Sequence, residues 1–417
     1  MKTLKAIVAK YNATSLILRI LVGLIVGAVL AVLVPGAGWL EEFGNLFVGA
    51  LKGIAPVLVF VIVASALAQG TSKLDRRFGT VIWLYMLTTF LAAAIAVITS
   101  FLFPQTIVLA EAAESEVVPQ GLGEVLNTLL TNFVANPVSA LLNGNYIGIL
   151  FWACLFGLAT KKYGAESTKV FLANTADAVS QIVRWIINLA PFGIMGLVYT
   201  NVVSNGLSIF TQYGRLLALL VGTMLFMALI VSPLIIFIYL HCNPYPLVFR
   251  CLKESGLTAF FTRSSAANIP VNMALCEKLR LDKDMYSVSI PLGATINMDG
   301  AAITITIMTL AAANTLGLQV SLPAAILLSV MSALGACGAS GVAGGSLLLI
   351  PMACSLFGIS NDIAMQVVGV GFIIGVVQDS VETALNSAGD VEFAATAEYH
   401  QWLKEGKPLP EFLGGKK

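Results

Sequence analysis

The sequence predicts an all-α protein that crosses a membrane several times, and three observations support this fold class. First, 58% of the 417 residues are hydrophobic and only 11% are charged, whereas a soluble protein carries about 25% charged residues. Second, apolar runs of roughly 20 residues, the length that spans a bilayer, recur along the chain. Third, Lys and Arg gather in only some of the connecting segments. The net charge of +1 offers no support for nucleic-acid binding.

The apolar segments and the basic residues between them predict the orientation in the membrane. The segments lie at about residues 14–34, 44–70, 79–103, 123–160 (with an interruption), 172–203, 214–240, 284–315, 322–357 and 361–397. Lys and Arg cluster at 1–10, 73–77, 161–162, 250–253, 278–283 and 404–417, and the loops around 35–43, 104–122, 204–213, 313–322 and 356–362 contain none. Because cytoplasmic loops are enriched in Lys and Arg, this asymmetry predicts that both termini lie in the cytoplasm.

Two regions do not fit simple membrane spans if both termini lie on one side. Residues 246–276 begin and end beside basic clusters, and residues 322–357 begin and end beside loops without basic residues. Both are rich in small residues, with RSSAANIP at 263–270 and GACGASGVAGG at 335–345. Paired interrupted segments that enter from opposite faces point to a transporter site near the middle of the membrane. We therefore expect two opposed re-entrant hairpins, and the alternative is two ordinary helices packed through small residues.

Polar residues form a stripe within the last apolar segment. At about 100° per residue, four of them share one face of an α-helix over about three turns: Asp379, Thr383, Asn386 and Asp390. Glu382 lies on the flank of this stripe. Each charge at the centre of a membrane helix costs about 2.5–3.5 kcal/mol. Such a stripe could simply join helices, but unpaired carboxylates suit that role poorly, so we favour the binding of a ligand or a cation.

The stretch GATINMDGAA at 293–302 predicts a break in another apolar segment. Asn297 and Asp299 are two residues apart, so a regular helix would point them about 200° apart. Gly300 permits local unwinding that lets both converge, with the carbonyl groups of Gly293 and Thr295 turned toward a cation. Carboxylate, amide and carbonyl oxygens suit an alkali or alkaline-earth ion rather than a transition metal. The alternative is an aspartate that is hydrogen-bonded at a helix kink.

The tip of the first hairpin has a composition that suits an anion. Serine hydroxyl groups and backbone N–H groups in TRSSAANIP could receive a carboxylate, as the N-termini of helices do. Arg263 in this stretch is a buried cation that needs a partner, and we expect this partner to be Glu382. The hydroxyl-rich YMLTT at 85–89 is by itself typical of hydrogen bonds within a helix.

Together these motifs resemble the dicarboxylate/amino acid:cation symporter family, which includes the glutamate transporters. NMDG at 297–300, the serine-rich and glycine-rich tips, and NxxGD at 386–390 occur in the order typical of the family, and the resemblance covers essentially the whole chain. It implies eight transmembrane helices plus two opposed re-entrant hairpins, a homotrimer and an elevator-like movement. It also implies a transporter rather than an enzyme, located in the inner membrane of a bacterial cell.

The resemblance also implies a division of the chain. Residues 1–245 would form mainly scaffold and trimerisation helices, although the helix at about 79–103 would join the transport core. The core would comprise residues 246–400, namely the hairpin 246–276, the unwound helix 284–315, the hairpin 322–357 and the last helix 361–397. Residues 401–417 would form a cytoplasmic tail.

The site residues of the family can be carried over to matching positions. The resemblance implies that Asp379 holds the ammonium group of an amino acid substrate, and that Thr383 contacts its side chain. Asn386 would bind the substrate carboxylate, together with Ser265 and the backbone from Val342 to Gly344.

Three sodium sites are implied in the same way, so sodium would be co-transported. The first would use the carbonyl groups of Gly293, Asn297 and Asn386 with the carboxylate of Asp390. The second would use the carbonyl groups of Thr295, Ala336, Cys337 and Ala339. The third would use Tyr85, Thr88, Thr89, Asn297 and Asp299.

One departure from the family bears on the substrate. Members that carry acidic amino acids have an arginine immediately before the threonine of the stripe, and here that position is Glu382. A second carboxylate on the substrate would meet an anion there instead of a bidentate partner. We therefore expect a small neutral amino acid, and within the family the pattern most resembles the members that carry serine and threonine.

Other functions remain open from the residues alone. Sodium-coupled transport of other small neutral or acidic amino acids or dicarboxylates is the nearest alternative. An intramembrane aspartyl protease could use Asp299 and Asp390, although it would need one raised pKa and would leave Asn297 and Asn386 without a role. An ion channel would leave Asp379 without a role.

Overall fold

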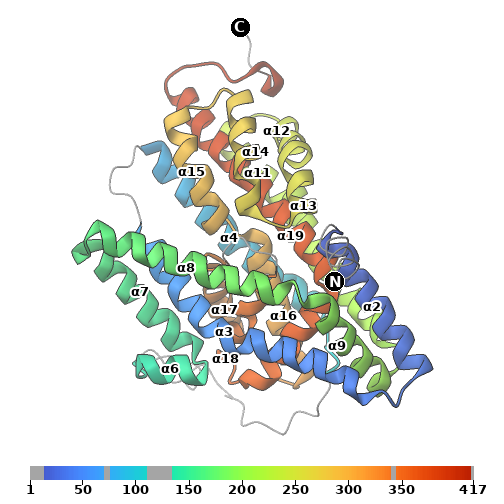
Figure 1. Cartoon of the computed structure of the whole chain (residues 1–417). Helices are drawn as coiled ribbons and strands as arrows, with labels where there is room; N and C mark the ends of the chain where they lie inside the picture. The colour runs from blue at the N-terminus through green and yellow to red at the C-terminus, as the bar shows by residue number, and fades with distance from the viewer. Residues whose placement is uncertain (1–13, 70–75, 110–133, 340–343, 415–417) are drawn as a thin grey trace, which may run out of the picture.

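The structure is a computed structural model that describes residues 14–69, 76–109, 134–339 and 344–414. Every regular element in these ranges is helical, and the chain forms an elongated bundle (Figure 1). The first half contains α2 (Leu16–Leu33), α3 (Glu41–Ala68), α4 (Arg76–Leu102), α6 (Pro137–Asn143), α7 (Tyr146–Tyr163), α8 (Glu166–Ile187), α9 (Ala190–Asn205), α10 (Ile209–Phe226) and α11 (Ser232–Leu240). The second half contains α12 (Tyr245–Cys251), α13 (Leu257–Thr262), α14 (Ser265–Lys278), α15 (Lys283–Ile296), α16 (Asp299–Thr315), α17 (Leu322–Ala336), α18 (Ile350–Ser355) and α19 (Asn361–Lys404).

The lengths of the helices agree with a membrane protein that has several apolar spans. Among the described residues, five helical stretches are long and apolar enough to cross a bilayer: Gly38–Ser65, Arg77–Leu102, Ile209–Leu240, Lys283–Thr315 and Asn361–Lys404. A sixth span is possible if α8 and α9, which meet at a bend of 53°, form one. Pro191 in the first turn of α9 lacks the N–H group that would continue the ladder of α8, which accounts for the bend.

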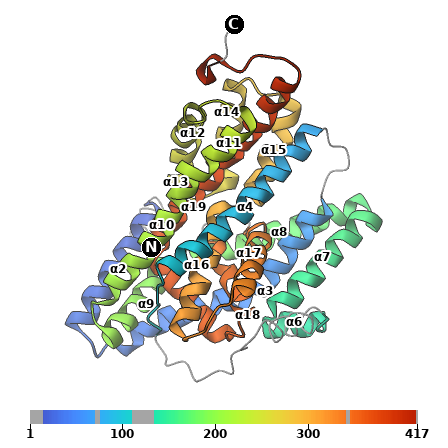
Figure 2. The same cartoon turned by 180° about the vertical axis from the view of Figure 1, so that it is seen from behind.

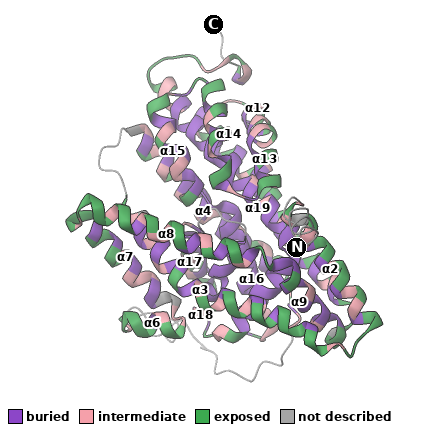
Figure 3. Cartoon of the chain, in the orientation of Figure 1, coloured by how far each residue is buried: buried purple, intermediate pink, exposed green. Residues whose placement is uncertain are grey.

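The helices fall into two groups that pack mainly among themselves. One group contains α2, α3, α7, α8 and α9. The other surrounds α19 and includes α4, α10, α11 and α13 to α18. Figure 3 shows that the buried residues concentrate along α19 and α16, whereas α6, α7 and α8 carry many exposed ones. The central helix α19 is therefore the element on which the second group is built.

Two helix–turn–helix units lie toward opposite ends of α19 (Figures 1 and 2). The first hairpin runs from α12 through a π-helical turn (Leu252–Gly256) and α13 to the tip at Arg263, and returns along α14. The second hairpin runs along α17 and returns through a 3₁₀ turn (Ser346–Leu349) and α18. The sequence predicted re-entrant hairpins at 246–276 and 322–357. The helices of these regions begin and end within two residues of those bounds, and their re-entrant course in a membrane stays a prediction.

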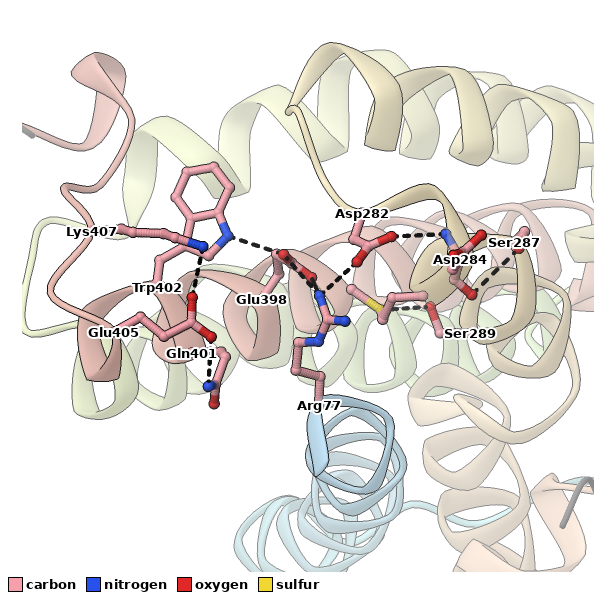
Figure 4. A network of polar contacts seen from close by, with 11 residues as sticks. Arg77, Asp282, Asp284, Ser287, Ser289, Glu398, Gln401, Trp402, Glu405 and Lys407 are labelled. Carbon is pink, nitrogen blue, oxygen red and sulfur yellow. Dashed lines mark hydrogen bonds and ion pairs between the residues drawn. The ribbon is translucent and has the colours of Figure 1, made fainter. Parts of the chain in front are cut away.

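A network of charged residues holds the beginning of α4 against α15 and the C-terminal end of α19 (Figure 4). Arg77 forms ion pairs with Asp282 at 2.8 Å and with Glu398 at 3.3 Å. Trp402 donates a hydrogen bond to Glu398 at 3.0 Å. The Arg77 guanidinium, through a hydrogen bond, lowers the pKa of Asp282 from its usual range. This network joins the beginnings of α4 and α15 to the end of α19.

Glycines allow α2 and α9 to approach closely, as small residues do in membrane helix pairs. A Cβ atom at Gly27 would lie 2.4 Å from the carbonyl oxygen of Met195, and one at Gly23 would lie 2.1 Å from that of Pro191. Because these neighbours are backbone atoms, they cannot rotate away. A larger residue would force the two helices apart.

We predict that Gly27→Ala lowers the thermal stability of the purified protein, because overpacking costs about 1–3 kcal/mol. Gly53→Ala in α3 is the matched control, since no atom lies within 4 Å of its added Cβ. Thermal unfolding in nanodiscs should give a lower melting temperature for Gly27→Ala alone. Equal melting temperatures for the two variants would contradict the close packing of α2 on α9.

Candidate functional site

The helix break predicted at the NMDG motif lies at the centre of the molecule. Helix α15 ends at Ile296 and α16 begins at Asp299. Asn297 and Met298 between them leave the helical region, with ψ angles of 84° and 49°. The Asn297 side chain is thereby turned toward α19 while Asp299 turns toward α4, as their contacts establish.

The polar stripe of α19 faces this break. Asn386 Oδ1 accepts a hydrogen bond from the Gly300 N–H group at 2.8 Å. Asn297 Nδ2 donates to the Asn386 carbonyl oxygen at 3.0 Å and to Asp390 Oδ1 at 3.1 Å. All these residues are buried. The polar groups of the break and those of the stripe are therefore in direct contact.

The residues expected in the first sodium site are close together. Besides Asn297, Asn386 and Asp390, a Cβ atom at Gly293 would lie 2.7 Å from Asp390 Oδ1 and 3.0 Å from the Tyr85 hydroxyl oxygen. Tyr85 also donates to the Asp390 carbonyl oxygen at 2.8 Å. Only glycine leaves room at position 293 for this approach of α15 to α19.

The hydroxyl ladder of α4 contacts the break from the other side, as the third sodium site requires. Thr89 Oγ1 donates to Asp299 Oδ1 at 3.0 Å and accepts from the Met298 N–H group at 3.2 Å. Thr88 Oγ1 donates to Asn297 Oδ1 at 3.5 Å. These side chains are fully or almost fully buried.

The contacts bring fewer of the residues expected in the second sodium site together. The Cys337 thiol lies 3.6 Å from the Ile296 carbonyl oxygen, so the end of α17 adjoins the end of α15. The Ala336 carbonyl oxygen accepts from the Ala339 N–H group at 2.9 Å. Thr295 is exposed, and its hydroxyl donates within α15 to Leu292 at 2.7 Å.

At the other end of the stripe, Asp379 contacts both hairpins. Arg263 Nε, from the tip of the first hairpin, donates to Asp379 Oδ2 at 2.6 Å. The Gly344 N–H group, from the second hairpin, donates to Asp379 Oδ1 at 3.2 Å. Gly344 has a φ of 73°, which favours glycine at this position.

The expected pairing of Arg263 with Glu382 is wrong, because Arg263 pairs with Asp379. Glu382 lies about one turn further along α19, and its carboxylate contacts hydroxyl and amide groups instead. Thr304 and Ser346 donate to its Oε2 at 2.8 and 2.9 Å, and Gln378 donates to the same oxygen. A carboxylate with three neutral donors does not require a guanidinium partner.

Of the other residues expected to bind the substrate, Thr383 and Ser265 lie within the described ranges. The Thr383 hydroxyl donates to the Asp379 carbonyl oxygen at 2.7 Å, within α19. Ser265 is buried in the first turn of α14. Val342 lies outside the described residues.

Sequence reasoning missed several side chains of the site. They are Thr304, Ser346 and Gln378 around Glu382, and Asn272, which donates to Asp390 and is hydrogen-bonded in turn to Ser255 and Asn268. Two signals were present in the sequence. Gln378 stands one turn before Glu382, and Asn268 and Asn272 stand one turn apart in NIPVN.

The site has more acidic than basic side chains. Asp299, Asp379, Glu382 and Asp390 are all buried around the break and the stripe. Among the described residues that contact them there, Arg263 is the one basic side chain. Because isolated buried charges are costly, such a site favours cationic ligands that neutralise the carboxylates.

Comparisons with known proteins agree with this arrangement. The model of the sodium:dicarboxylate symporter family matches residues 16–399. The chain is 75% identical to a serine/threonine transporter SstT of Bifidobacterium adolescentis over 416 residues, which cover 100% of this chain and 97% of the relative. It is 59% identical to a serine/threonine transporter SstT of Streptococcus agalactiae, over 95% of this chain and 98% of the relative. A Streptococcus thermophilus relative of the same name is 55% identical over 96% of this chain and 100% of its own length.

Proposed function

Because the chain belongs to the sodium:dicarboxylate symporter family, we propose that it imports serine and threonine by symport with sodium ions. Family membership makes it a multi-pass membrane transporter rather than an enzyme, which removes the aspartyl protease as a candidate. The names of its relatives support serine and threonine as substrates. The observation that carries the proposal is the pair of carboxylates, Asp379 and Glu382, at the substrate end of the stripe.

The charges at this end favour a zwitterion over a dicarboxylate. Asp379 and Glu382 together outnumber Arg263 by one charge. An amino acid would bring its ammonium group to Asp379, and its carboxylate could bind the Nη1 group of Arg263, which has no partner among the described residues. Asn386 and Ser265 would complete this carboxylate pocket.

A second carboxylate on the substrate would lie near Glu382. Two like charges 4 Å apart repel by about 4 kcal/mol at an effective dielectric constant of about 20. Thr304, Ser346 and Gln378 already donate hydrogen bonds to Glu382. They therefore do not offset the repulsion between Glu382 and a second substrate carboxylate. A hydroxyl group adds no charge, and Thr383 or Glu382 could hydrogen-bond to it.

Sodium is proposed as a co-substrate at the three sets of oxygen ligands. The grouping of Gly293, Asn297, Asn386 and Asp390 supports the first site, and the contacts of Thr88 and Thr89 with Asn297 and Asp299 support the third. The second site, at Thr295, Ala336, Cys337 and Ala339, rests on the adjacency of Cys337 and Ile296. Carboxylate, amide and hydroxyl oxygens suit a hard cation.

The proposal includes the architecture implied by the family. It comprises eight transmembrane helices, two re-entrant hairpins, a homotrimer and an elevator movement of the core against the scaffold. It also comprises a bacterial inner membrane with both termini in the cytoplasm. The separate packing of α2, α3, α7, α8 and α9 supports a scaffold, but α10 and α11 pack against α19, so the boundary of the core at 246 is less sharp than the resemblance implies.

Uptake by proteoliposomes tests the function. Radiolabelled serine should accumulate when an inward sodium gradient is imposed, and it should not when potassium or choline replaces sodium. Unlabelled threonine should compete at concentrations similar to serine, and aspartate should compete only weakly. Uptake that is independent of sodium, or aspartate inhibition equal to that of threonine, would contradict the proposal.

We predict that Asp379→Asn abolishes serine uptake, because the substrate ammonium loses its counter-charge. Breaking a buried charged pair costs about 3–5 kcal/mol, so uptake should fall at least about a hundredfold. Asp177→Asn, at an exposed position of α8, is the control and should transport normally. Wild-type uptake by a correctly folded Asp379→Asn protein would exclude Asp379 as the ammonium site.

A second prediction concerns the choice between neutral and acidic substrates. Glu382→Arg should increase the potency of aspartate as a competitor by at least about tenfold, since repulsion is replaced by a bidentate partner. Glu382→Gln keeps the size of the side chain and removes only the charge, so it should give a smaller increase. If aspartate competes no better against either variant, Glu382 does not select the substrate.

A further inference from the structure

A buried polar cluster joins the first hairpin to Asp390, and none of its members is among the proposed substrate or sodium ligands. The cluster consists of Ser255, Asn268 and Asn272, each with no exposed surface. Ser255 lies on the entering arm of the hairpin, and both asparagines lie on the returning arm, α14. Three fully buried polar side chains require hydrogen-bond partners.

The partners form a continuous chain of hydrogen bonds. Asn268 Nδ2 donates to Ser255 Oγ at 3.0 Å and to Asn272 Oδ1 at 3.2 Å. The Ser255 hydroxyl donates to Asn272 Oδ1. On its other side, Asn272 Nδ2 donates to the Ser387 carbonyl oxygen at 3.1 Å and to Asp390 Oδ2 at 3.4 Å. The Asn272 side chain therefore accepts hydrogen bonds from the hairpin through Oδ1 and donates to α19 through Nδ2.

The two oxygens of Asp390 are thus held by different parts of the molecule. Oδ1 accepts from Asn297 at the break between α15 and α16, and Oδ2 accepts from Asn272 in the first hairpin. Fixed donors of this kind orient a carboxylate before it binds a ligand. A displacement of the hairpin must therefore change the hydrogen bonding and the orientation of the Asp390 carboxylate.

The entering arm also has an irregular backbone at this point. Ser255 lies within the π-helical turn Leu252–Gly256, which interrupts the α-helical arm between α12 and α13. Such turns occur frequently at functional sites. Asn268 Nδ2 donates to the Ser255 carbonyl oxygen at 3.3 Å and so supports this turn from the returning arm.

We propose that Asn272 is a positioning residue that couples the occupancy of the Asp390 site to the packing of the first hairpin, through Ser255 and Asn268. This inference rests on the proposed function, since it takes sodium as the ligand of Asp390. Coupling between two sites is reciprocal. Sodium at Asp390 therefore stabilises the packed hairpin, and a disturbed hairpin weakens sodium binding.

The first test measures serine uptake by proteoliposomes as a function of sodium concentration. Asn272→Leu keeps the approximate size of the side chain and removes its hydrogen bonds. The loss of a hydrogen bond to a charged group should raise the half-saturating sodium concentration about tenfold, with the maximal rate less affected. Asn201→Leu is the matched control, because Asn201 is a buried asparagine that contacts Leu197 and Tyr213 instead.

The second test uses Ser255→Ala, which changes a residue with no hydrogen bond to Asp390. The proposed chain of contacts predicts a smaller rise in the half-saturating sodium concentration, about threefold. The double variant should resemble Asn272→Leu rather than add both effects, since interacting residues are not additive. If Asn272→Leu does not fold, Ser255→Ala and Asn268→Leu carry the same test.

Hydrogen exchange distinguishes the proposed coupling from a purely structural role of Asn272. In the wild type, sodium should slow amide exchange in residues 257–278. This protection should disappear in Asn272→Leu at saturating sodium and persist in Asn201→Leu. Wild-type sodium dependence and protection in Asn272→Leu would overturn the inference, whereas uptake by the wild type without sodium would overturn the proposed function instead.

Discussion

The hydrogen bonds of Asn297 are the contacts on which the site depends. This residue lies in the break between α15 and α16, and its amide donates to Asn386 and Asp390 of α19 and accepts from Thr88 of α4. A continuous helix would point Asn297 and Asp299 about 200° apart. It could not place Asn297 against α19 and Asp299 against Thr89 of α4 in the way that the break does. The break therefore brings α4, α15, α16 and α19 together around a group of oxygen atoms that are buried from solvent.

The hairpins are held by polar contacts because apolar packing alone gives little preference within a bilayer, where lipid tails are as apolar as leucine. The first hairpin reaches α19 through Arg263 at Asp379 and through Asn272 at Asp390. The second hairpin reaches it through Gly344 at Asp379 and through Ser346 at Glu382. The carboxylates of α19 thus determine where both hairpins pack.

Much of this arrangement could be predicted from the sequence because it depends on local periodicity. The spacing of Asp379, Thr383, Asn386 and Asp390 fixes one face of a helix, and the NMDG motif fixes the break. Periodicity does not give the depth at which a hairpin tip meets another helix, so Arg263 was assigned to Glu382 instead of Asp379. Thr304 and Ser346 were missed for the same reason, since they approach Glu382 from other elements.

The distribution of charge links the fold to the choice of substrate. Asp379 has a cationic partner, Arg263, whereas Glu382 has only neutral donors. Neutral donors can stabilise an ionised carboxylate but do not cancel its charge, so with Glu382 ionised the site carries an excess of negative charge. An ammonium group and sodium ions reduce this excess of negative charge, and a second carboxylate increases it. The proposed selection against acidic substrates would therefore follow from the same burial of carboxylates that makes the site suitable for cations.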